Sequence, residues 1–120
     1  MSQHVLIVDD DPLTREALAL LLNTEGYVVA EAGDGAEALA RLRSGGLPSL
    51  VLLDLLMPGM DGWRFLAERQ RQPSLGAIPV LVLTAARGID SPALRAMGAE
   101  DILQKPIAPE DVLTAIRRYC

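Results

Sequence analysis

The sequence predicts an α/β protein in which helices cover both faces of a five-stranded parallel sheet. Three observations lead to this prediction: short apolar runs alternate with longer helical patterns, the alternation occurs five times, and the runs show no regular polar positions. Continuous apolar runs are typical of parallel strands that are buried on both sides. The (βα)5 order favours a doubly wound sheet with right-handed crossovers.

The expected strands are the apolar runs themselves. They occupy residues 5–8, 27–30, 50–53, 80–83 and 101–103. The last run is the weakest of these predictions, because Pro106 follows it closely and a proline cannot continue a central strand.

Capping residues mark where the expected helices begin and end. Asp11 and Pro12 predict the start of the first helix, with aspartate as the N-cap, and Gly26 predicts its end. This helix is expected to face the sheet with an apolar stripe of Leu13, Ala17, Leu20 and Leu21. The later helices are expected to start at Asp34, at Asp61, at Ser91 with Pro92, and at Pro109.

The composition describes one small acidic domain. The chain has 120 residues, of which 50% are apolar and 22% charged, which is enough for one core without disulfides or a structural metal. The 11 Lys and Arg against 16 Asp and Glu give a net charge of −5, which argues against direct nucleic-acid binding. No basic region precedes the first apolar run, no stretch is long enough to span a bilayer, and the single cysteine, Cys120, fits a reducing compartment. We therefore expect a cytoplasmic domain over residues 1–120, with no membrane partner.

Acidic side chains directly follow two of the expected strands. Asp9 and Asp10 end the first strand, and Asp54 ends the third. Ligands of open α/β sheets bind beyond the carboxyl ends of the strands, so these acids are expected to meet there if the two strands are neighbours. Clustered carboxylates repel one another, and a divalent cation such as Mg²⁺, which prefers oxygen ligands, removes the repulsion. Asp11 is better explained as a helix cap.

A hydroxyl and an ammonium are expected at the same edge of the sheet. Thr84 ends the fourth strand, and Lys105, the only lysine among 11 basic residues, follows the fifth. A compact ammonium suits a small anion as a point charge, although either residue taken alone is also common in an ordinary strand or loop. Acids, a hydroxyl and a cation together are what phosphoryl transfer requires.

On these motifs the chain resembles the receiver domains of bacterial response regulators, the phosphoacceptor half of two-component signalling. The motifs are the acidic pair Asp9 and Asp10, the stretch DLLMPGMDG at residues 54–62, Thr84 with Ala85, and Lys105 with Pro106. The resemblance covers essentially the whole chain. It implies a flavodoxin-like three-layer sandwich with the strand order 2-1-3-4-5.

The resemblance also implies a role for each site residue. Asp54 would be the phosphoacceptor, Thr84 the switch hydroxyl, and Lys105 a contact of the phosphoryl group. Mg²⁺ would be held by Asp9, Asp10, Asp54 and the backbone carbonyl of Leu56. The chain would not be an enzyme, apart from self-phosphorylation and slow self-dephosphorylation on Asp54.

The partners implied by the resemblance are those of a phosphorelay. A sensor histidine kinase or a histidine phosphotransfer protein would supply the phosphoryl group. The sequence leaves open an output domain, a separate protein target and a phosphorylation-dependent dimer.

Two other functions compete with this interpretation. A Mg²⁺-dependent aspartate-nucleophile phosphohydrolase of the haloacid-dehalogenase type needs a second acid two residues after its nucleophile, where this chain has Leu56. A silent receiver-like interaction module would be expected to lose the acids, Thr84 or Lys105, and the chain keeps them all. The chain departs from many receivers at Ile102 and Ile107, where an aromatic residue is common, so the output mechanism stays open.

Overall fold

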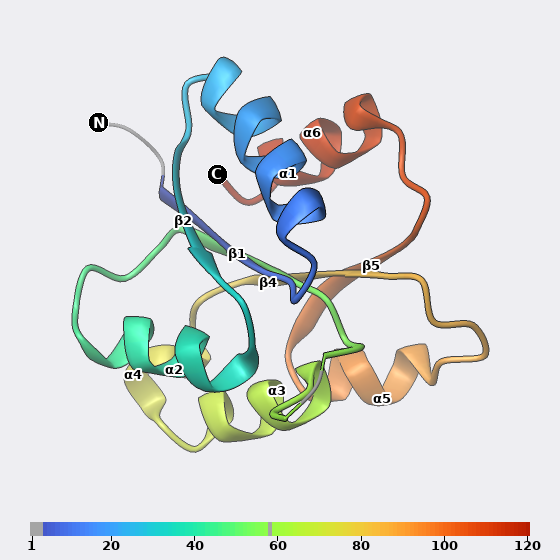
Figure 1. Ribbon diagram of the computed structural model, residues 1–120. Coiled ribbons are helices and arrows are strands. Elements are labelled where there is room, and N and C mark those ends of the chain that lie inside the picture. Colours follow the sequence, from blue (N-terminus) through green and yellow to red (C-terminus); the bar gives the residue numbers. More distant parts are fainter. Residues whose placement is uncertain (1–3, 58) are drawn as a thin grey trace.

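Among the described residues, 4–57 and 59–120 of the computed structural model, the strands form one parallel sheet (Figure 1). The strands are β1 (His4–Val8), β2 (Val28–Ala32), β3 (Leu50–Leu53), β4 (Val80–Thr84) and β5 (Ala99–Gln104). Their order in the sheet is β2-β1-β3-β4-β5, which confirms the predicted topology. The neighbours β1 and β3 pair from Val5 opposite Leu50 to Val8 opposite Leu53, so both strands end at the same edge.

The helices lie on the two faces of this sheet, as the doubly wound prediction requires (Figure 1). They are α1 (Pro12–Thr24), α2 (Gly35–Arg43), α3 (Gly62–Gln70), α4 (Pro73–Gly76), α5 (Ser91–Ala96) and α6 (Pro109–Arg117). One core contains Val5 and Ile7 of β1 with side chains of α1 and α6. The other contains Leu6 and Val8 with side chains of α2 to α5. Successive strand residues point to opposite faces, so a strand covered on both sides is apolar throughout.

Aspartate side chains cap the helices that lead away from the carboxyl edge of the sheet. Asp11, Asp34 and Asp61 each accept a hydrogen bond from a backbone N–H in the first turn of α1, α2 and α3. These three predicted helix starts are confirmed. The predicted starts at Ser91 and at Pro109 are also confirmed, and the residue that caps α5 is Asp90, one position before Ser91.

The predicted apolar stripe of α1 is wrong for most of its length. Leu13 and Leu20 are 74% and 70% exposed, Ala17 is exposed, and the buried residues of this helix are Ala19 and Leu22. Because residues 17–22 are all apolar, more than one face of the helix has the required spacing, and periodicity alone cannot choose between them. The helix therefore buries one apolar stripe and leaves another in solvent.

The two edge strands differ from their predicted bounds. β2 extends beyond residue 30 because Glu31 and Ala32 pair with Ile7 and Val8 of β1. β5 begins at Ala99 rather than at residue 101, and its register with β4 shifts after Val80. Polar residues are tolerated in both strands because each has a neighbour on one side only.

The short helix α4 is absent from the predicted elements, and a buried arginine explains how it is held. Arg69 of α3 is 2% exposed, and its Nη2 donates to the carbonyl oxygens of Gly76 at 3.1 Å and Ile78 at 2.9 Å. These carbonyls lie at and just beyond the end of α4, so Arg69 ties that turn to α3. Within the described residues, no helix is both long enough and apolar enough to cross a bilayer.

Candidate functional site

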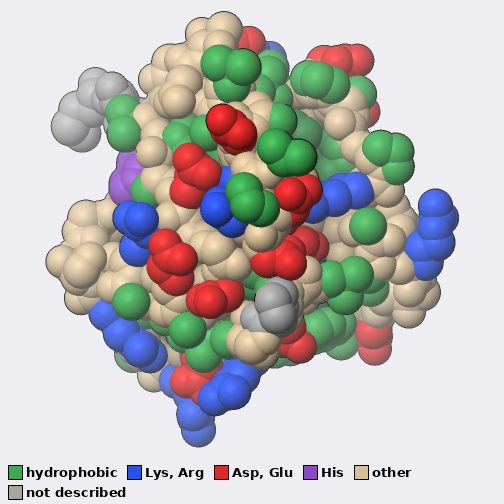
Figure 2. All heavy atoms as spheres, in the orientation of Figure 1, with side chains coloured by type: hydrophobic (Ala, Val, Ile, Leu, Met, Phe, Trp, Pro, Cys, Tyr) green, Lys and Arg blue, Asp and Glu red, His purple; other side chains and the backbone are tan. Residues whose placement is uncertain are grey.

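Three carboxylates meet where β1 and β3 end. Asp9, Asp10 and Asp54 each offer one oxygen, and these oxygens all lie within 4.8 Å of one another. The register of β1 against β3 brings them together, because Asp9 follows Val8 and Asp54 follows Leu53, which are direct partners. The predicted convergence of the acids is thus present. Figure 2 shows acidic side chains gathered on the face of the molecule in view, with basic side chains among them.

Asp9 is buried and every polar group on it is bonded. Its carboxylate accepts from the Asp11 N–H at 2.9 Å and from Lys105 Nζ at 2.8 Å. Its own N–H donates to the carbonyl of Ala32, and its carbonyl accepts from Arg15. Asp9 is therefore held rigidly between β1, β2 and the loop that follows β5. Asp10 differs, because its side chain is exposed.

Asp54 is also buried, with 8% of its surface exposed. Its Oδ1 accepts from the Leu56 N–H at 3.2 Å, and its Oδ2 lies 4.0 Å from Lys105 Nζ. Burial raises the pKa of the Asp54 carboxyl above its usual value of 3.8. The negative charges of Asp9 and Asp10 also raise this pKa, whereas Lys105 and the Leu56 N–H lower it.

Thr84 and Lys105 reach the same edge from β4 and from the loop after β5. The Lys105 N–H donates to the Thr84 carbonyl at 2.8 Å, which extends the pairing of the two strands past Gln104. Thr84 is fully buried, and its Oγ1 accepts from the Ala86 N–H at 3.1 Å. The ammonium of Lys105 therefore lies beside the acids, as predicted, while the Thr84 hydroxyl bonds to its own loop.

The donor set of this cluster fits Mg²⁺. All three side chains supply hard oxygen ligands, and Mg²⁺ is usually bound by one or two carboxylates together with water and phosphate oxygens. The Lys105 ammonium balances part of the negative charge, and the exposed Asp10 leaves the cluster open to solvent. The Leu56 carbonyl stays a prediction as a ligand, although the Leu56 N–H places this backbone next to Asp54.

Arg15 also belongs to this edge of the sheet, although it is not among the predicted site residues. Its guanidinium donates to the Asp9 carbonyl at 2.6 Å and forms an ion pair with Glu31 at the end of β2. The available signal was its place in the first turn after the Asp11 cap, which directs the side chain toward the end of β1. A bond to a backbone carbonyl leaves no trace in residue types, so this signal indicates the direction of the Arg15 side chain but not its partner.

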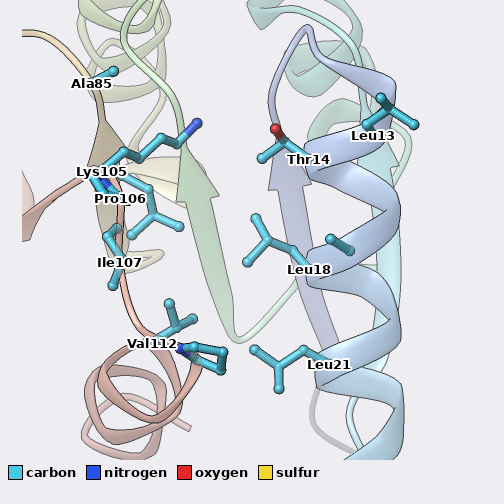
Figure 3. A pocket seen from close by; sticks show the side chains of 12 residues that line it. Leu13, Thr14, Leu18, Leu21, Ala85, Lys105, Pro106, Ile107 and Val112 are labelled. Atoms are coloured by element: carbon cyan, nitrogen blue, oxygen red, sulfur yellow. The ribbon is translucent and has the colours of Figure 1, made fainter.

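An apolar groove of about 710 Å³ adjoins the acidic cluster between α1 and α6. Figure 3 shows Leu18 and Leu21 of α1 facing Ile107 and Val112 across it, with Lys105 at one end. The exposed stripe of α1, Leu13, Ala17 and Leu20, lies on the same helix. The molecule thus presents uncovered apolar surface directly beside its acidic cluster.

The family model for the response regulator receiver domain matches residues 5–117 of this chain. The chain is 40% identical over 118 residues to the response regulator MprA of Mycobacterium ulcerans, covering 98% of this chain and 50% of MprA. It also matches DNA-binding response regulators named MtrA, and it spans about half the length of both kinds of relative.

Solved structures with the same fold include response regulators. A putative response regulator from Chloroflexus aurantiacus is similar with a TM-score of 0.89 and 34% identity, covering 99% of this chain and 98% of that one. The response regulator TrrA of Thermotoga maritima, solved in complex with Mg²⁺-BeF, has a TM-score of 0.86 and 30% identity, covering 98% and 99% of the two chains.

Proposed function

The chain belongs to the family of response regulator receiver domains, which act as phosphoryl-accepting signalling switches, and we propose that Asp54 is its phosphoacceptor. The observation that carries this proposal is the setting of the Asp54 carboxylate. It is buried at the carboxyl edge of the sheet, its Oδ1 is held by the Leu56 N–H, and its Oδ2 faces the Lys105 ammonium at 4.0 Å. Oδ2 is thereby the oxygen without a close hydrogen bond, and it is the proposed nucleophile.

The transfer we propose is a direct displacement at phosphorus. A carboxylate oxygen attacks without a general base, so the new bond joins Asp54 Oδ2 to phosphorus. The bond between phosphorus and the donor's imidazole nitrogen breaks, and that nitrogen keeps the electron pair. Mg²⁺, when bound by Asp9, Asp10, Asp54 and the Leu56 carbonyl, supplies positive charge for the transferring oxygens. Lys105 supplies further positive charge, and the Thr84 hydroxyl donates to the bound phosphoryl group after turning toward it.

The proposed donor is a sensor histidine kinase or a histidine phosphotransfer protein. The exposed stripe of α1 and the groove beside it suit a helical partner, because an amphipathic helix binds by laying its apolar face into such a groove. The surface adjoins Lys105, so a partner bound there would bring its phosphorylated side chain toward Asp54.

We propose further that residues 1–120 form one receiver unit that acts in the cytoplasm on an output domain or a separate protein. Beyond the switch itself, we propose only self-phosphorylation from small donors and slow self-dephosphorylation on Asp54.

Intact-mass measurement with a small phosphodonor and Mg²⁺ tests this function. One phosphoryl group per chain is expected for the wild type and none for Asp54→Asn. Asp61→Asn is the matched control, because Asp61 caps α3 and asparagine caps a helix equally well. Labelling of Asp54→Asn at another residue would show that Asp54 is not the acceptor.

A further inference from the structure

Arg15 contacts the backbone of the acidic pair rather than its carboxylates. Nη1 donates to the Asp9 carbonyl at 2.6 Å, and Nε donates to Glu31 Oε1 at 3.3 Å. In the described part of the chain, no ion pair joins Arg15 to an acid of the cluster. The side chain of Arg15 is 21% exposed, so its bond to the carbonyl is partly shielded from water. Arg15 therefore acts on this site through geometry more than through its charge.

The carbonyl that Arg15 holds belongs to the peptide joining Asp9 to Asp10. A peptide unit is planar, so fixing its oxygen also fixes the direction in which the nitrogen of Asp10 lies. Asp9 has other restraints, because its carboxylate is bonded to the Asp11 N–H and to Lys105. The exposed carboxylate of Asp10 has no hydrogen bond or ion pair among the described residues. The orientation of Asp10 thus depends on its backbone.

We propose that Arg15 is the positioning residue that aims Asp10 into the Mg²⁺ site. This inference rests on the proposed function, since it takes the acidic cluster to be the metal site. Residues that orient metal ligands affect affinity strongly, because a ligand that must be ordered on binding weakens the complex. Asp10 is the ligand that needs such ordering most, and the bond from Arg15 acts on the peptide from which it extends.

Glu31 supports Arg15 from the other side. It lies in β2 opposite Ile7 of β1, one residue before the strand ends, and it is 44% exposed, so its ion pair with Arg15 is largely solvated. Ion pairs of this kind contribute little by themselves. We therefore expect Glu31 to matter less than the bond between Arg15 and the Asp9 carbonyl.

Calorimetric titration of Mg²⁺ into purified variants tests the proposal. Arg15→Met should raise the Kd for Mg²⁺ about tenfold, the low end of the effect seen when a residue that orients a metal ligand is removed. Arg15→Lys keeps the charge but loses the planar fork, and it should raise the Kd by about threefold or more. Glu31→Gln should change the Kd by less than about threefold. Arg41→Gln removes an exposed arginine that forms an ion pair with Glu37, away from the acidic cluster, and it should leave the Kd unchanged.

Two further measurements separate positioning from general loss of structure. The amide resonance of Asp10 should shift in Arg15→Met without added Mg²⁺, while resonances in α6 stay in place. Urea unfolding records any change in stability separately from the change in Kd. If Arg15→Met does not fold, Arg15→Lys carries the same test.

The Asp10→Asn variant separates a failure of the role of Arg15 from a failure of the proposed metal site. A result in which Arg15→Met and Arg15→Lys each bind Mg²⁺ with the wild-type Kd, while Asp10→Asn loses binding, would overturn the role of Arg15 and leave the metal site standing. Wild-type affinity in Asp10→Asn would overturn the metal site and the inference with it.

Discussion

Lys105 Nζ lies 2.8 Å from Asp9 Oδ2 and 4.0 Å from Asp54 Oδ2, so the lysine is hydrogen-bonded to Asp9 and makes only a long ion pair with the proposed phosphoacceptor. A cation bound by Asp9 would compete with Lys105 for the Asp9 carboxylate. Such competition would free the Lys105 ammonium to move toward Asp54, the residue proposed to carry the negatively charged phosphoryl group. The pairing therefore links metal binding to the position of the lysine.

Replacing Lys105 by methionine should raise the pKa of the Asp54 carboxyl further. Lys105 is the largest of the influences that lower this pKa, and methionine keeps most of the side-chain volume without the charge. The pKa can be followed by NMR titration of the Asp54 carboxyl carbon. Arg41→Met removes a cation outside the site and should leave the pKa of the Asp54 carboxyl unchanged. The same midpoint in Lys105→Met and the wild type would contradict the electrostatic role of Lys105.

Asp54→Asn should stabilise the protein at neutral pH, by on the order of 1 kcal/mol. Because burial raises the pKa of Asp54 in the folded state, the ionised carboxylate destabilises the fold at pH values above that pKa. The gain from asparagine should be present at about pH 7 and should disappear by about pH 3, where the wild-type carboxyl is protonated in both states. Urea unfolding at both pH values measures this. A gain that persists unchanged at the lower pH would have another cause.

Asp10→Asn should abolish the stabilisation of the protein by Mg²⁺. A ligand that binds only the folded state raises the melting temperature, and Asp10 supplies one of the three clustered oxygens. Without added Mg²⁺ the variant should be as stable as the wild type or slightly more stable, since like-charge repulsion is relieved. Thermal unfolding with and without Mg²⁺ measures both effects. Asp11→Asn is the matched control, because it changes the same charge one residue later and asparagine keeps the helix cap.

Local sequence rules predicted the parts of this molecule that depend on local chemistry. Continuous apolar runs indicated buried strands, and aspartates before helical patterns indicated three caps, at Asp11, Asp34 and Asp61. The convergence of Asp9 with Asp54 followed from parallel strands ending at one edge. The buried face of α1 and the presence of α4 could not be predicted, because side-chain contacts between elements decide both. The buried face of α1 depends on which of several apolar stripes meets the sheet, and α4 is held by hydrogen bonds from the buried Arg69 to the carbonyl oxygens of Gly76 and Ile78.

Gly62→Ala should destabilise the fold and disturb the phosphoacceptor. A Cβ at this position would lie 2.7 Å from the Asp54 carbonyl oxygen and 2.7 Å from the Leu55 Cα, and neither backbone atom can easily yield. A loss of about 1–3 kcal/mol in the free energy of unfolding is expected from such overpacking. Gly76→Ala is the control, because a Cβ there meets nothing within 4 Å. Equal stability of the two variants in urea would show that the start of α3 can move away from Asp54.

A conformational change that starts at Thr84 has to reach β5 without an aromatic residue at position 102. Ile102 is a partly buried aliphatic residue packed against the core of α2 to α5, so it cannot exchange an exposed ring for a buried one. Ala86 offers another connection. Its N–H donates to the Thr84 hydroxyl at 3.1 Å, and its carbonyl accepts from the Gln104 side chain at 2.8 Å. If the Thr84 hydroxyl turns toward a phosphoryl group, it releases the Ala86 N–H, and a movement of Ala86 then reaches β5 through Gln104.

Beryllofluoride with Mg²⁺ should therefore shift the amide resonances of Ala85, Ala86 and Arg87 strongly, with smaller shifts toward Ile102 and α6. A ligand changes a conformational equilibrium only through contacts that differ between the two states, and the missing ring removes one such difference. In Gln104→Leu the shifts beside Thr84 should remain and those in β5 should shrink. Ile102→Val should keep the wild-type pattern, because one aliphatic side chain replaces another. Shifts across α6 as large as those beside Thr84, or a β5 response that survives in Gln104→Leu, would show that the signal takes a route other than Ala86 and Gln104.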